Sequence, residues 1–395
     1  MKHFNRGLTG AALAVATLLV ACTSGGMFSH MNAKYPTLDG SLPLVLAHRG
    51  ASGYLPEHTL AAYKKAIEMG ADFVEPDLVV TKDGHLVARH EPNITNTTNV
   101  AARSEFANRK TTVIMDGVAE TGWFAADFTL AELKTLRVNQ TMAERDQSFN
   151  GKFEVPTFRE ILELVKTENA KAGRNGRVVG VYPETKHPTY HDNIGLSIEP
   201  RLLAMLDEYG LNKKDSAVVI QSFEVGNLKL LRQRTPVRLV QLIGGGRVDP
   251  TGKVVLTPPF DKPYDMRVKN DARTVVDMLT PAGLKDIKTY SDGIGPSKHF
   301  IVSSAQVMGA DGKPRDLNAD GKFDERDRLA LPPTSLINDA HAAGLFVHPY
   351  TFRNDARFLL ADYKGDPKAE YVKFYKLGVD GLFSDFTDTA VEALK

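Results

Sequence analysis

Residues 44–91, LVLAHRGASGYLPEHTLAAYKKAIEMGADFVEPDLVVTKDGHLVARHE, contain the alternation on which the fold prediction rests. An apolar run of strand length at Leu44 to His48 precedes an amphipathic stretch of helix length at Thr59 to Glu68, and a second apolar run begins at Phe73. A strand, a helix and a further strand in succession form the unit of a mainly parallel sheet. The segment therefore predicts an α/β protein.

The same alternation continues to the end of the chain. Strands are predicted at Phe73 to Leu78, Leu86 to His90, Val178 to Val181, Ala217 to Gln221, Val237 to Leu242, Leu345 to Pro349 and Asp380 to Phe383, with another near Gly293 or Phe300. Helices are predicted at Leu130 to Leu136, Phe158 to Lys166, Glu199 to Tyr209, Val225 to Arg232, Leu336 to Ala343 and Lys368 to Lys376. This number of repeats favours a (β/α)₈ TIM barrel over a doubly wound sheet, although both folds are built from the same unit.

Three stretches interrupt the repeat, near residues 93–151, 244–288 and 309–328. The first is polar with little regular pattern before Leu130, and the other two are rich in Gly, Pro and charge. Long connections of this kind belong in loops, where added length costs little stability. We predict a single barrel domain over residues 41–395 with three loop insertions.

The composition excludes some classes of protein. Hydrophobic residues make up 42% of the 395 residues and charged residues 25%, which is typical of a folded globular protein. The 49 basic and 48 acidic residues give a formal net charge of +1, so no global field attracts a polyanion. We expect no nucleic-acid partner.

The N-terminus resembles an export signal. Lys2 and Arg6 precede an apolar run from Leu8 to Ala21, which is shorter than the about 20 residues needed to span a bilayer. The run ends in Leu19-Val20-Ala21-Cys22, which resembles the lipobox of bacterial lipoproteins, and Cys22 is the single cysteine. The resemblance implies a signal peptide at residues 1–21, lipidation of Cys22, a tether at 22–40, and a location on the periplasmic side of a bacterial membrane. An ordinary signal peptide with a chance cysteine is the alternative.

Unusual polar residues stand at the carboxyl ends of predicted strands, where barrel enzymes build their active sites. They are His48 and Arg49, Glu75 and Asp77, His90 and Glu91, and Glu184 and Lys186. Because side chains alternate along a strand, Glu75 and Asp77 share a face, as do Glu184 and Lys186. Three carboxylates and two imidazoles are therefore expected to lie together at the carboxyl end of the barrel.

This combination suits phosphodiester chemistry. Glu75, Asp77 and Glu184 supply oxygen ligands for a divalent cation, Ca²⁺ first and Mg²⁺ as the alternative. The cations Arg49 and Lys186 can bind phosphate oxygens, and His48 and His90 can divide the general-base and general-acid roles. Taken singly, each residue has a structural explanation, such as a surface ion pair between Glu184 and Lys186. Their joint position favours function.

These segments resemble the glycerophosphodiester phosphodiesterase family, within it the longer periplasmic bacterial members. The matching segments are LAHRGASGYLPEHTLAAY (46–63), GADFVEPDLVVTKDGHLVARHE (70–91), YPETKHP (182–188), QSFE (221–224), DGIGP (292–296), VHPYTFR (347–353) and GVDGLFSDF (378–386). The resemblance implies a (β/α)₈ barrel and hydrolysis of small-molecule glycerophosphodiesters to glycerol 3-phosphate and an alcohol. It also implies catalytic histidines at His48 and His90, metal ligands at Glu75, Asp77 and Glu184, and phosphate-binding cations at Arg49 and Lys186.

The chain departs from the usual family pattern at Pro76, at His58 and at Glu91. Phe223, Tyr350 and Phe383 follow predicted strands near the same face and are candidate contacts to the glycerol or alcohol moiety, with core packing as the alternative. We predict structural or rim positions for four other histidines, His187, His191, His341 and His348.

A second metal site is predicted within the third insertion. Asp316, Asn318, Asp320, Lys322, Asp324 and Asp327 occupy positions one, three, five, seven, nine and twelve of a calcium-loop spacing, with Gly321 at position six. Asp327 replaces the usual glutamate at position twelve. A structural Ca²⁺ is the prediction, and a solvated surface turn is the alternative.

Two other functions remain open at this point. One is a phospholipase that cleaves a bulkier lipid headgroup on the same barrel, and the other is an exported protein that binds glycerophosphodiesters without turnover. Paired histidines argue against the second, because binding alone requires no acid and base.

Overall fold

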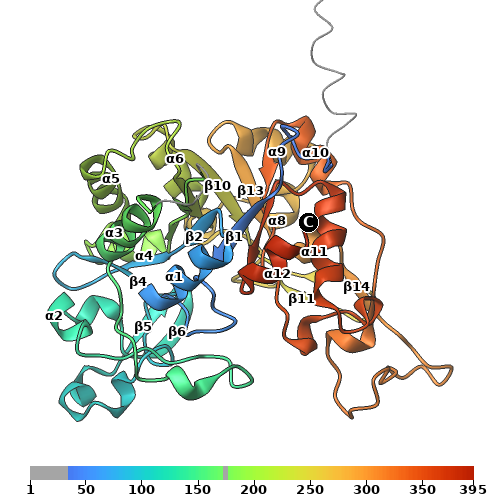
Figure 1. The fold of residues 1–395 in the computed structure, drawn as a ribbon, viewed down its shortest axis with the longest axis horizontal. Coiled ribbons are helices and arrows are strands. Elements are labelled where there is room, and N and C mark those ends of the chain that lie inside the picture. Colours follow the sequence, from blue (N-terminus) through green and yellow to red (C-terminus); the bar gives the residue numbers. More distant parts are fainter. Residues whose placement is uncertain (1–33, 172–176) are drawn as a thin grey trace, which may run out of the picture.

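The computed structural model describes residues 34–171 and 177–395, so the predicted signal peptide and Cys22 lie outside the described residues. A ring of parallel strands is surrounded by helices (Figure 1). The strands of the ring are β1 (Leu44–His48), β2 (Phe73–Glu75) continued by β3 (Asp77–Val80), β7 (Gly180–Val181) continued by β8 (Glu184–Thr185), β9 (Val219–Ser222), β10 (Arg238–Ile243), β13 (Gly293–Pro296), β16 (Phe346–Val347) and β17 (Gly381–Ser384).

The strand order closes the ring. One sheet runs β17-β1-β2-β7 and the other β16-β13-β10-β9-β8-β3-β4, and the two meet where β2 continues into β3 and β7 into β8. On the remaining side, the backbone N–H groups of Asp380 and Phe383 donate to the carbonyls of Val347 (2.9 Å) and Pro349 (3.0 Å). The predicted (β/α)₈ TIM barrel is thereby confirmed.

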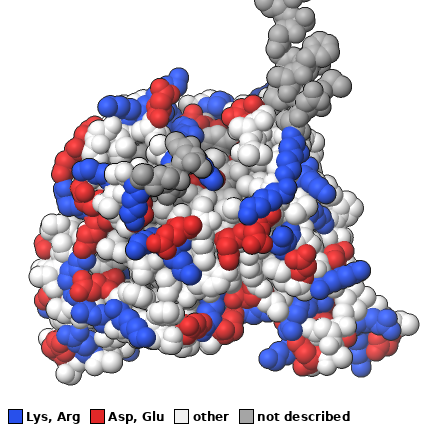
Figure 2. Space-filling model, viewed as in Figure 1, with Lys and Arg blue, Asp and Glu red and all other residues white. Residues whose placement is uncertain are grey.

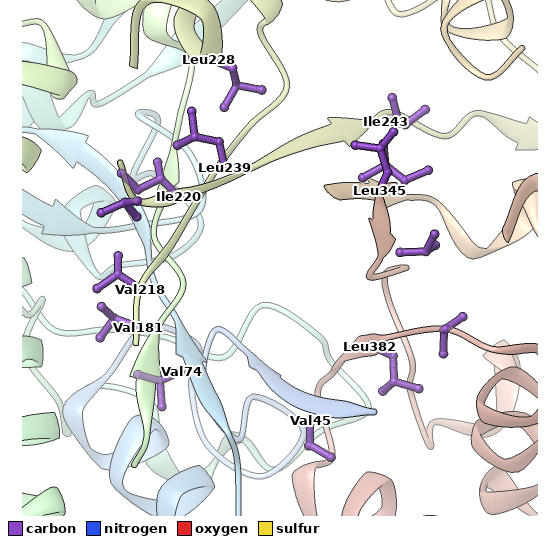
Figure 3. Close-up of a cluster of buried hydrophobic side chains, with 14 of the residues drawn as sticks. Val45, Val74, Val181, Val218, Ile220, Leu228, Leu239, Ile243, Leu345 and Leu382 are labelled. Carbon is purple, nitrogen blue, oxygen red and sulfur yellow. The ribbon is translucent and has the colours of Figure 1, made fainter. Parts of the chain in front are cut away.

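Side chains alternate between the inside and the outside of the barrel, as the period of two along a strand requires. Val45, Val74, Val181 and Leu382 point outward and belong to the main hydrophobic cluster (Figure 3). The intervening positions fill the interior with Leu46, Phe73, Tyr182, Val219, Val240, Leu242 and Phe383. This packed interior forms the floor beneath the carboxyl ends of the strands.

The helices begin and end at residues whose chemistry explains the boundaries. The Thr59 hydroxyl accepts from the N–H of Ala62 at the start of α1, Gly70 ends that helix at φ 103°, and Thr157 and Glu160 form a capping box on α3. The helices are α1 (Leu60–Met69), α2 (Leu130–Leu133), α3 (Phe158–Asn169), α4 (Pro188–Asn193), α5 (Ile198–Glu208), α6 (Val225–Arg232), α7 (Tyr264–Val268), α8 (Val275–Met278), α9 (Pro281–Lys288), α10 (Leu336–Ala342), α11 (Pro367–Leu377) and α12 (Thr387–Glu392).

Two predicted strands differ from the structure. The single strand predicted from Phe73 to Leu78 is divided at Pro76, because proline has no N–H to continue the ladder. The segment from Leu86 to His90 is not a barrel strand: β4 (Leu86–Ala88) pairs antiparallel with β3 and forms a hairpin on the rim. The strand predicted near Gly293 is β13.

The first insertion is more ordered than its sequence pattern indicates. Residues 93–151 contain a hairpin of β5 (Thr111–Met115) and β6 (Val118–Gly122), which turns at Asp116 and Gly117. Trp123 is buried in a separate hydrophobic cluster that also includes Val79 of β3 and Val87 of β4. The insertion is therefore a small subdomain with its own core, packed beneath the β3–β4 hairpin.

The other two insertions carry short elements. Residues 244–288 contain β11 (Arg247–Val248), β12 (Val254–Val255) and helices α7 to α9. Residues 309–328 follow β14 (Ser304–Gln306) and end at the first residue of β15 (Arg328–Ala330). The orange segment around residues 309–328 projects from the barrel in Figure 1. Short 3₁₀ helices complete the elements, at Val100–Ala102, Ser104–Arg109, Ala125–Asp127, Gln147–Phe149, Lys298–Phe300, Glu325–Asp327, Ala356–Phe358 and Ala361–Tyr363.

The surface carries both signs of charge. Lys and Arg are interspersed with Asp and Glu over the face in view (Figure 2), in line with the net charge of +1. Among the helices of the described residues, none combines the length and the apolar composition that crossing a membrane would require.

Candidate active site

His48 is the last residue of β1, and a buried carboxylate holds its ring. Nδ1 of His48 lies 2.6 Å from Oδ1 of Asp385, which directly follows β17, the neighbour of β1 in the sheet. An ionised carboxylate can only accept, so Nδ1 carries the hydrogen and Nε2 of the neutral ring keeps its lone pair. Burial and the charge of Arg49 lower the pKa of His48 from its usual 6.5, against the opposing effect of Asp385. The arrangement fixes the tautomer that a general base requires.

Asp385 is itself held by two arginines. Its Oδ2 accepts from Nη2 of Arg145 (2.6 Å) and from Nε of Arg353 (3.0 Å). Burial alone would raise the pKa of Asp385, but the charges of Arg353, His48 and Arg145 hold that pKa well below its usual range. Arg145 comes from the first insertion, so the inserted subdomain contributes to the support of His48.

Glu75, Asp77 and Glu184 form a compact carboxylate group. One oxygen from each lies within 4.8 Å of the others, and no second such group of His, Cys, Asp or Glu occurs in the described part of the chain. The register of the sheet explains this proximity, since Asp77 pairs with Glu184 across β3 and β8. All three residues are buried, with exposed fractions of 2%, 1% and 6%. Glu184 and Lys186 do form an ion pair (3.1 Å), but it is buried, so the alternative of a surface pair is wrong.

The electrostatics of this group indicate missing positive charge. Burial and the charges of Asp77 and Glu184 raise the pKa of Glu75 well above its usual range, and burial with the charge of Asp77 raises the pKa of Glu184 to about 8. Oδ1 of Asp77 is buried without a hydrogen-bond partner. Buried carboxylates normally have a counter-charge. The donor set fits a hard divalent cation, which prefers oxygen ligands.

Neighbouring polar groups orient the carboxylates. The backbone N–H of Arg49 donates to Oε2 of Glu75 (2.8 Å), and Nε2 of Gln221 donates to Oε1 of Glu75 (2.9 Å). Nε2 of His58 lies 2.9 Å from Oδ2 of Asp77, and His58 is fully buried. Arg49 (φ 58°) and His58 (φ 54°) both adopt left-handed backbone geometry, a cost that non-glycine residues tolerate mainly at functional sites.

The predicted phosphate-binding cations lie beside this group. Nη1 of Arg49 donates to Glu57 (2.8 Å), and Nζ of Lys186 lies 3.1 Å from Glu184. Both side chains line a cavity of about 400 Å³. Each cation thus has a carboxylate partner on one side and the cavity on the other.

His90 reaches the same cavity from the rim hairpin. It follows β4, its side chain is 34% exposed, and its Nδ1 lies 3.2 Å from Oε1 of Glu91. Partial burial and the positive charges of Arg49 and Lys186 lower the pKa of His90 well below its usual value. The cavity of about 400 Å³ is lined by both His48 and His90, together with Glu75 and Glu184. The predicted convergence is found, although His90 arrives on an antiparallel hairpin.

The remaining candidates divide into two groups. Phe223 and Tyr350 line the cavity with ring centroids 6.2 Å apart, and the interior residue Phe383 lines it as well. His348 is buried in the barrel against Tyr182, His191 is buried, and His341 bonds Asp380, so these histidines are structural as predicted. His187 lies at the rim between Glu91 (2.6 Å) and Asp116 (2.8 Å).

The predicted calcium loop is ordered by its own hydrogen bonds. Asp316 accepts from the N–H groups of Asp320 (3.3 Å) and Gly321 (2.7 Å), and Asp327 is buried and accepts from Leu317 (2.8 Å). The guanidinium of Arg326 lies between Asp320 and Asp324. Binding of Ca²⁺ by this loop stays a prediction. Arg326 already supplies a positive charge to Asp320 and Asp324, two of the six predicted ligand positions.

Comparison with known proteins gives the family. The sequence pattern of the Glycerophosphoryl diester phosphodiesterase family matches residues 48–389, a segment that begins at His48 and includes the carboxylate group. The chain belongs to this family. Glycerophosphodiester phosphodiesterase GDPD6 of Arabidopsis thaliana is 37% identical over 95% of this chain and 93% of its own length. A glycerophosphodiester phosphodiesterase of Haemophilus influenzae is 30% identical over 96% of this chain and 97% of its own length.

A solved structure supports the fold. A phosphodiesterase of Oleispira antarctica, in complex with its product sn-glycerol-3-phosphate, is 19% identical and covers 91% of this chain and 99% of its own, with a TM-score of 0.51. The family predicted from the sequence is confirmed, and the enzyme class of a glycerophosphodiester phosphodiesterase, a phosphoric diester hydrolase, follows from it.

Sequence reasoning missed several residues of the site. Asp385 and Gln221 stand at strand ends, so the signal that selected His48 could have selected them too. Glu57 and Arg353 lie in the matching segments but were assigned no role. Arg145 lies in an insertion whose sequence carries no sign of contact with the site.

Proposed function

We propose that this enzyme hydrolyses glycerophosphodiesters to glycerol 3-phosphate and an alcohol, with a divalent cation and a pair of histidines. The observation that carries the proposal is that His48 and His90 line one cavity with the carboxylates Glu75 and Glu184. An acid and a base on two sides of a phosphate site are what cleavage of a diester requires.

The residues that would hold the cation are Glu75, Asp77 and Glu184, with Ca²⁺ as the expected ion and Mg²⁺ as the alternative. When bound, such an ion holds phosphate oxygens and offsets the negative charge that builds on them during the reaction. Arg49 and Lys186 orient the phosphate from the wall of the cavity, the first through a planar fork and the second as a compact charge.

His48 is suited to the role of base. Its Nδ1–H donates to Asp385, so Nε2 can take the proton of the attacking hydroxyl, and the carboxylate then stabilises the imidazolium. The attacking group is water or a hydroxyl of the substrate's glycerol. In the second case a further hydrolytic step releases glycerol 3-phosphate.

His90 is suited to the role of acid. Burial and the charges of Arg49 and Lys186 lower the pKa of His90 in the free protein, and a bound phosphate anion offsets the two charges and favours the protonated ring. The protonated ring then donates to the departing alkoxide. The cation-lined wall thus couples the protonation of His90 to the presence of substrate.

The deciding experiment is release of glycerol 3-phosphate from a panel of glycerophosphodiesters, with and without a chelator. Release that the chelator stops and that Ca²⁺ restores supports the proposal. Turnover of intact phosphatidylcholine, with none of its glycerophosphodiester, would favour the phospholipase instead. If the wild type never turned over glycerophosphocholine and the His48→Ala variant still bound it, a binding protein would be favoured.

We also propose that the enzyme is exported and held on the periplasmic side of a bacterial membrane by a lipid on Cys22. The apolar run and the Leu19-Val20-Ala21-Cys22 sequence support this assignment.

A further inference from the structure

A second cavity, of about 320 Å³, opens on the other side of His90. It shares His90, Glu184, Lys186, Phe223 and Leu242 with the first cavity. His48, in contrast, lines only the first cavity. Two cavities that meet at one reactive centre match a diester, which carries one substituent on each side of phosphorus. Since His90 is suited to protonate the leaving group, the second cavity is placed to receive the departing alcohol.

Part of the wall of this second cavity comes from the insertions. Phe260, Tyr264, Val275 and Met278 belong to residues 244–288, and Asp116 belongs to the β5–β6 turn. Phe223 completes an apolar and aromatic lining. A surface of this kind suits the methyl groups and the charge of a quaternary ammonium, because aromatic faces attract cations.

One carboxyl group on this wall, that of Glu224, has no positive partner within the described residues, whereas Asp116 contacts His187 (2.8 Å) and Asp265 contacts Lys269 (3.8 Å). Glu224 is 4% exposed, accepts only from the N–H (3.1 Å) and hydroxyl (2.6 Å) of Thr189, and takes part in no ion pair within the described residues. Oδ1 of Asp116 is buried without a partner, as is Oδ1 of Asp265 nearby. Burial and the charges of Asp265 and Asp116 raise the pKa of Glu224 to about 8.

The basic residues around the cavity already have partners. Lys186 contacts Glu184 (3.1 Å), His187 bridges Glu91 and Asp116, and Nζ of Lys262 donates to the carbonyl of Asp271 (2.5 Å). None of them contacts Glu224. A cationic group of the bound alcohol would therefore be the positive partner of Glu224.

We infer that the second cavity is the subsite for the alcohol headgroup and that it selects headgroups carrying an ammonium, with Glu224 as the specificity-determining carboxylate. The inference rests on the proposed function. It excludes neutral polyols as the preferred guests, because they would bring no positive charge to the buried carboxyl group of Glu224.

The test compares the wild type with Glu224→Gln on two cationic substrates, glycerophosphocholine and glycerophosphoethanolamine, and on neutral glycerophosphoglycerol. Glu224→Gln should lower kcat/KM for the cationic substrates by about 10- to 100-fold and for the neutral one by less than about 3-fold. Choline should inhibit the wild type competitively and the variant at least about tenfold more weakly. Glu168→Gln, which removes a buried carboxylate of α3 outside both cavities, is the matched control and should leave the substrate ratio unchanged.

The outcomes separate the two claims. Equal losses on all three substrates, or inhibition by choline that is the same in wild type and variant, would overturn the ammonium subsite. No release of glycerol 3-phosphate by the wild type from any substrate would instead overturn the proposed function.

Discussion

Asp385 and His48 form a buried pair, with Oδ1 of the carboxylate 2.6 Å from Nδ1 of the ring. The pair joins the first and last strands of the barrel at its carboxyl edge, so the reactive ring depends on closure of the barrel. Arg145 and Arg353 keep the carboxylate ionised, which keeps the hydrogen of His48 on Nδ1.

The first prediction concerns this pair. Asp385→Asn replaces an obligate acceptor with a side chain that can donate to Nδ1, so the ring adopts the wrong tautomer. We expect kcat to fall by about 10²- to 10⁴-fold with little change in KM. Asp355→Asn is the control, since Asp355 bonds Arg145 (2.7 Å) but not His48. Near-normal kcat in Asp385→Asn would show that the tautomer of His48 does not matter.

The second prediction concerns the two histidines. His48→Ala and His90→Ala should each lower kcat by about 10²- to 10⁴-fold, far more than they change KM. In the wild type, activity should follow a bell in pH, and its acidic limb should lie below pH 6.5 because burial lowers the pKa of His48. A His90→Ala enzyme with near-normal turnover of glycerophosphoethanolamine would remove the second histidine from the mechanism.

The third prediction concerns the carboxylate group without its cation. Burial and Asp77 raise the pKa of Glu184 from 4.5 to about 8, so the native state binds more protons than the unfolded chain between these pH values. The free energy of unfolding of chelated protein should therefore decrease as the pH rises through this window. Ca²⁺ binds the ionised carboxylates, so the increase in Tm on adding Ca²⁺ should grow with pH.

Glu184→Gln tests the same point. This variant should show a flatter pH dependence of Tm in the chelated protein and should lose both Ca²⁺ affinity and activity. Glu75→Gln should likewise lose Ca²⁺ affinity and activity. A Ca²⁺-dependent increase in Tm that is the same at pH 5 and pH 8 in the wild type would contradict the assignment.

The fourth prediction concerns the N-terminus. In a bacterial host, wild-type protein should incorporate labelled palmitate and sediment with membranes, whereas Cys22→Ala should not be labelled. A variant that begins at Tyr35 should stay in solution with unchanged kcat/KM, because the site residues all lie at or after His48, the last residue of β1. Membrane association of the unlabelled Cys22→Ala protein would indicate an uncleaved apolar segment instead of a lipid anchor.

The sequence predicted those parts of the site that lie at the ends of barrel strands. The sequence pattern of an apolar run that ends in a polar residue was enough to predict His48, Glu75 and Glu184. The parallel register of the strands brings their side chains together. Asp77 was placed correctly beside Glu75, but the division of the strand at Pro76, which puts the two residues in different sheets, could not be read from the apolar pattern.

Contacts between distant segments were not predictable in the same way. Arg145 and Asp385 are 240 residues apart, and their contact depends on the path of the first insertion. That insertion appeared patternless because its hairpin strands carry exposed polar residues, such as Thr112 and Thr121, whereas its core depends on scattered residues such as Trp123. Packing among such residues is a tertiary property that no short periodicity encodes.

His90 is carried by a hairpin whose outer face rests on the small core around Trp123, whereas His48 is carried by the barrel. Regions with separate cores can open locally, with free energies below that of global unfolding. Opening of the small core would move one imidazole away from the other while the barrel and its carboxylate group stay intact. On heating, activity should therefore fall before the barrel unfolds.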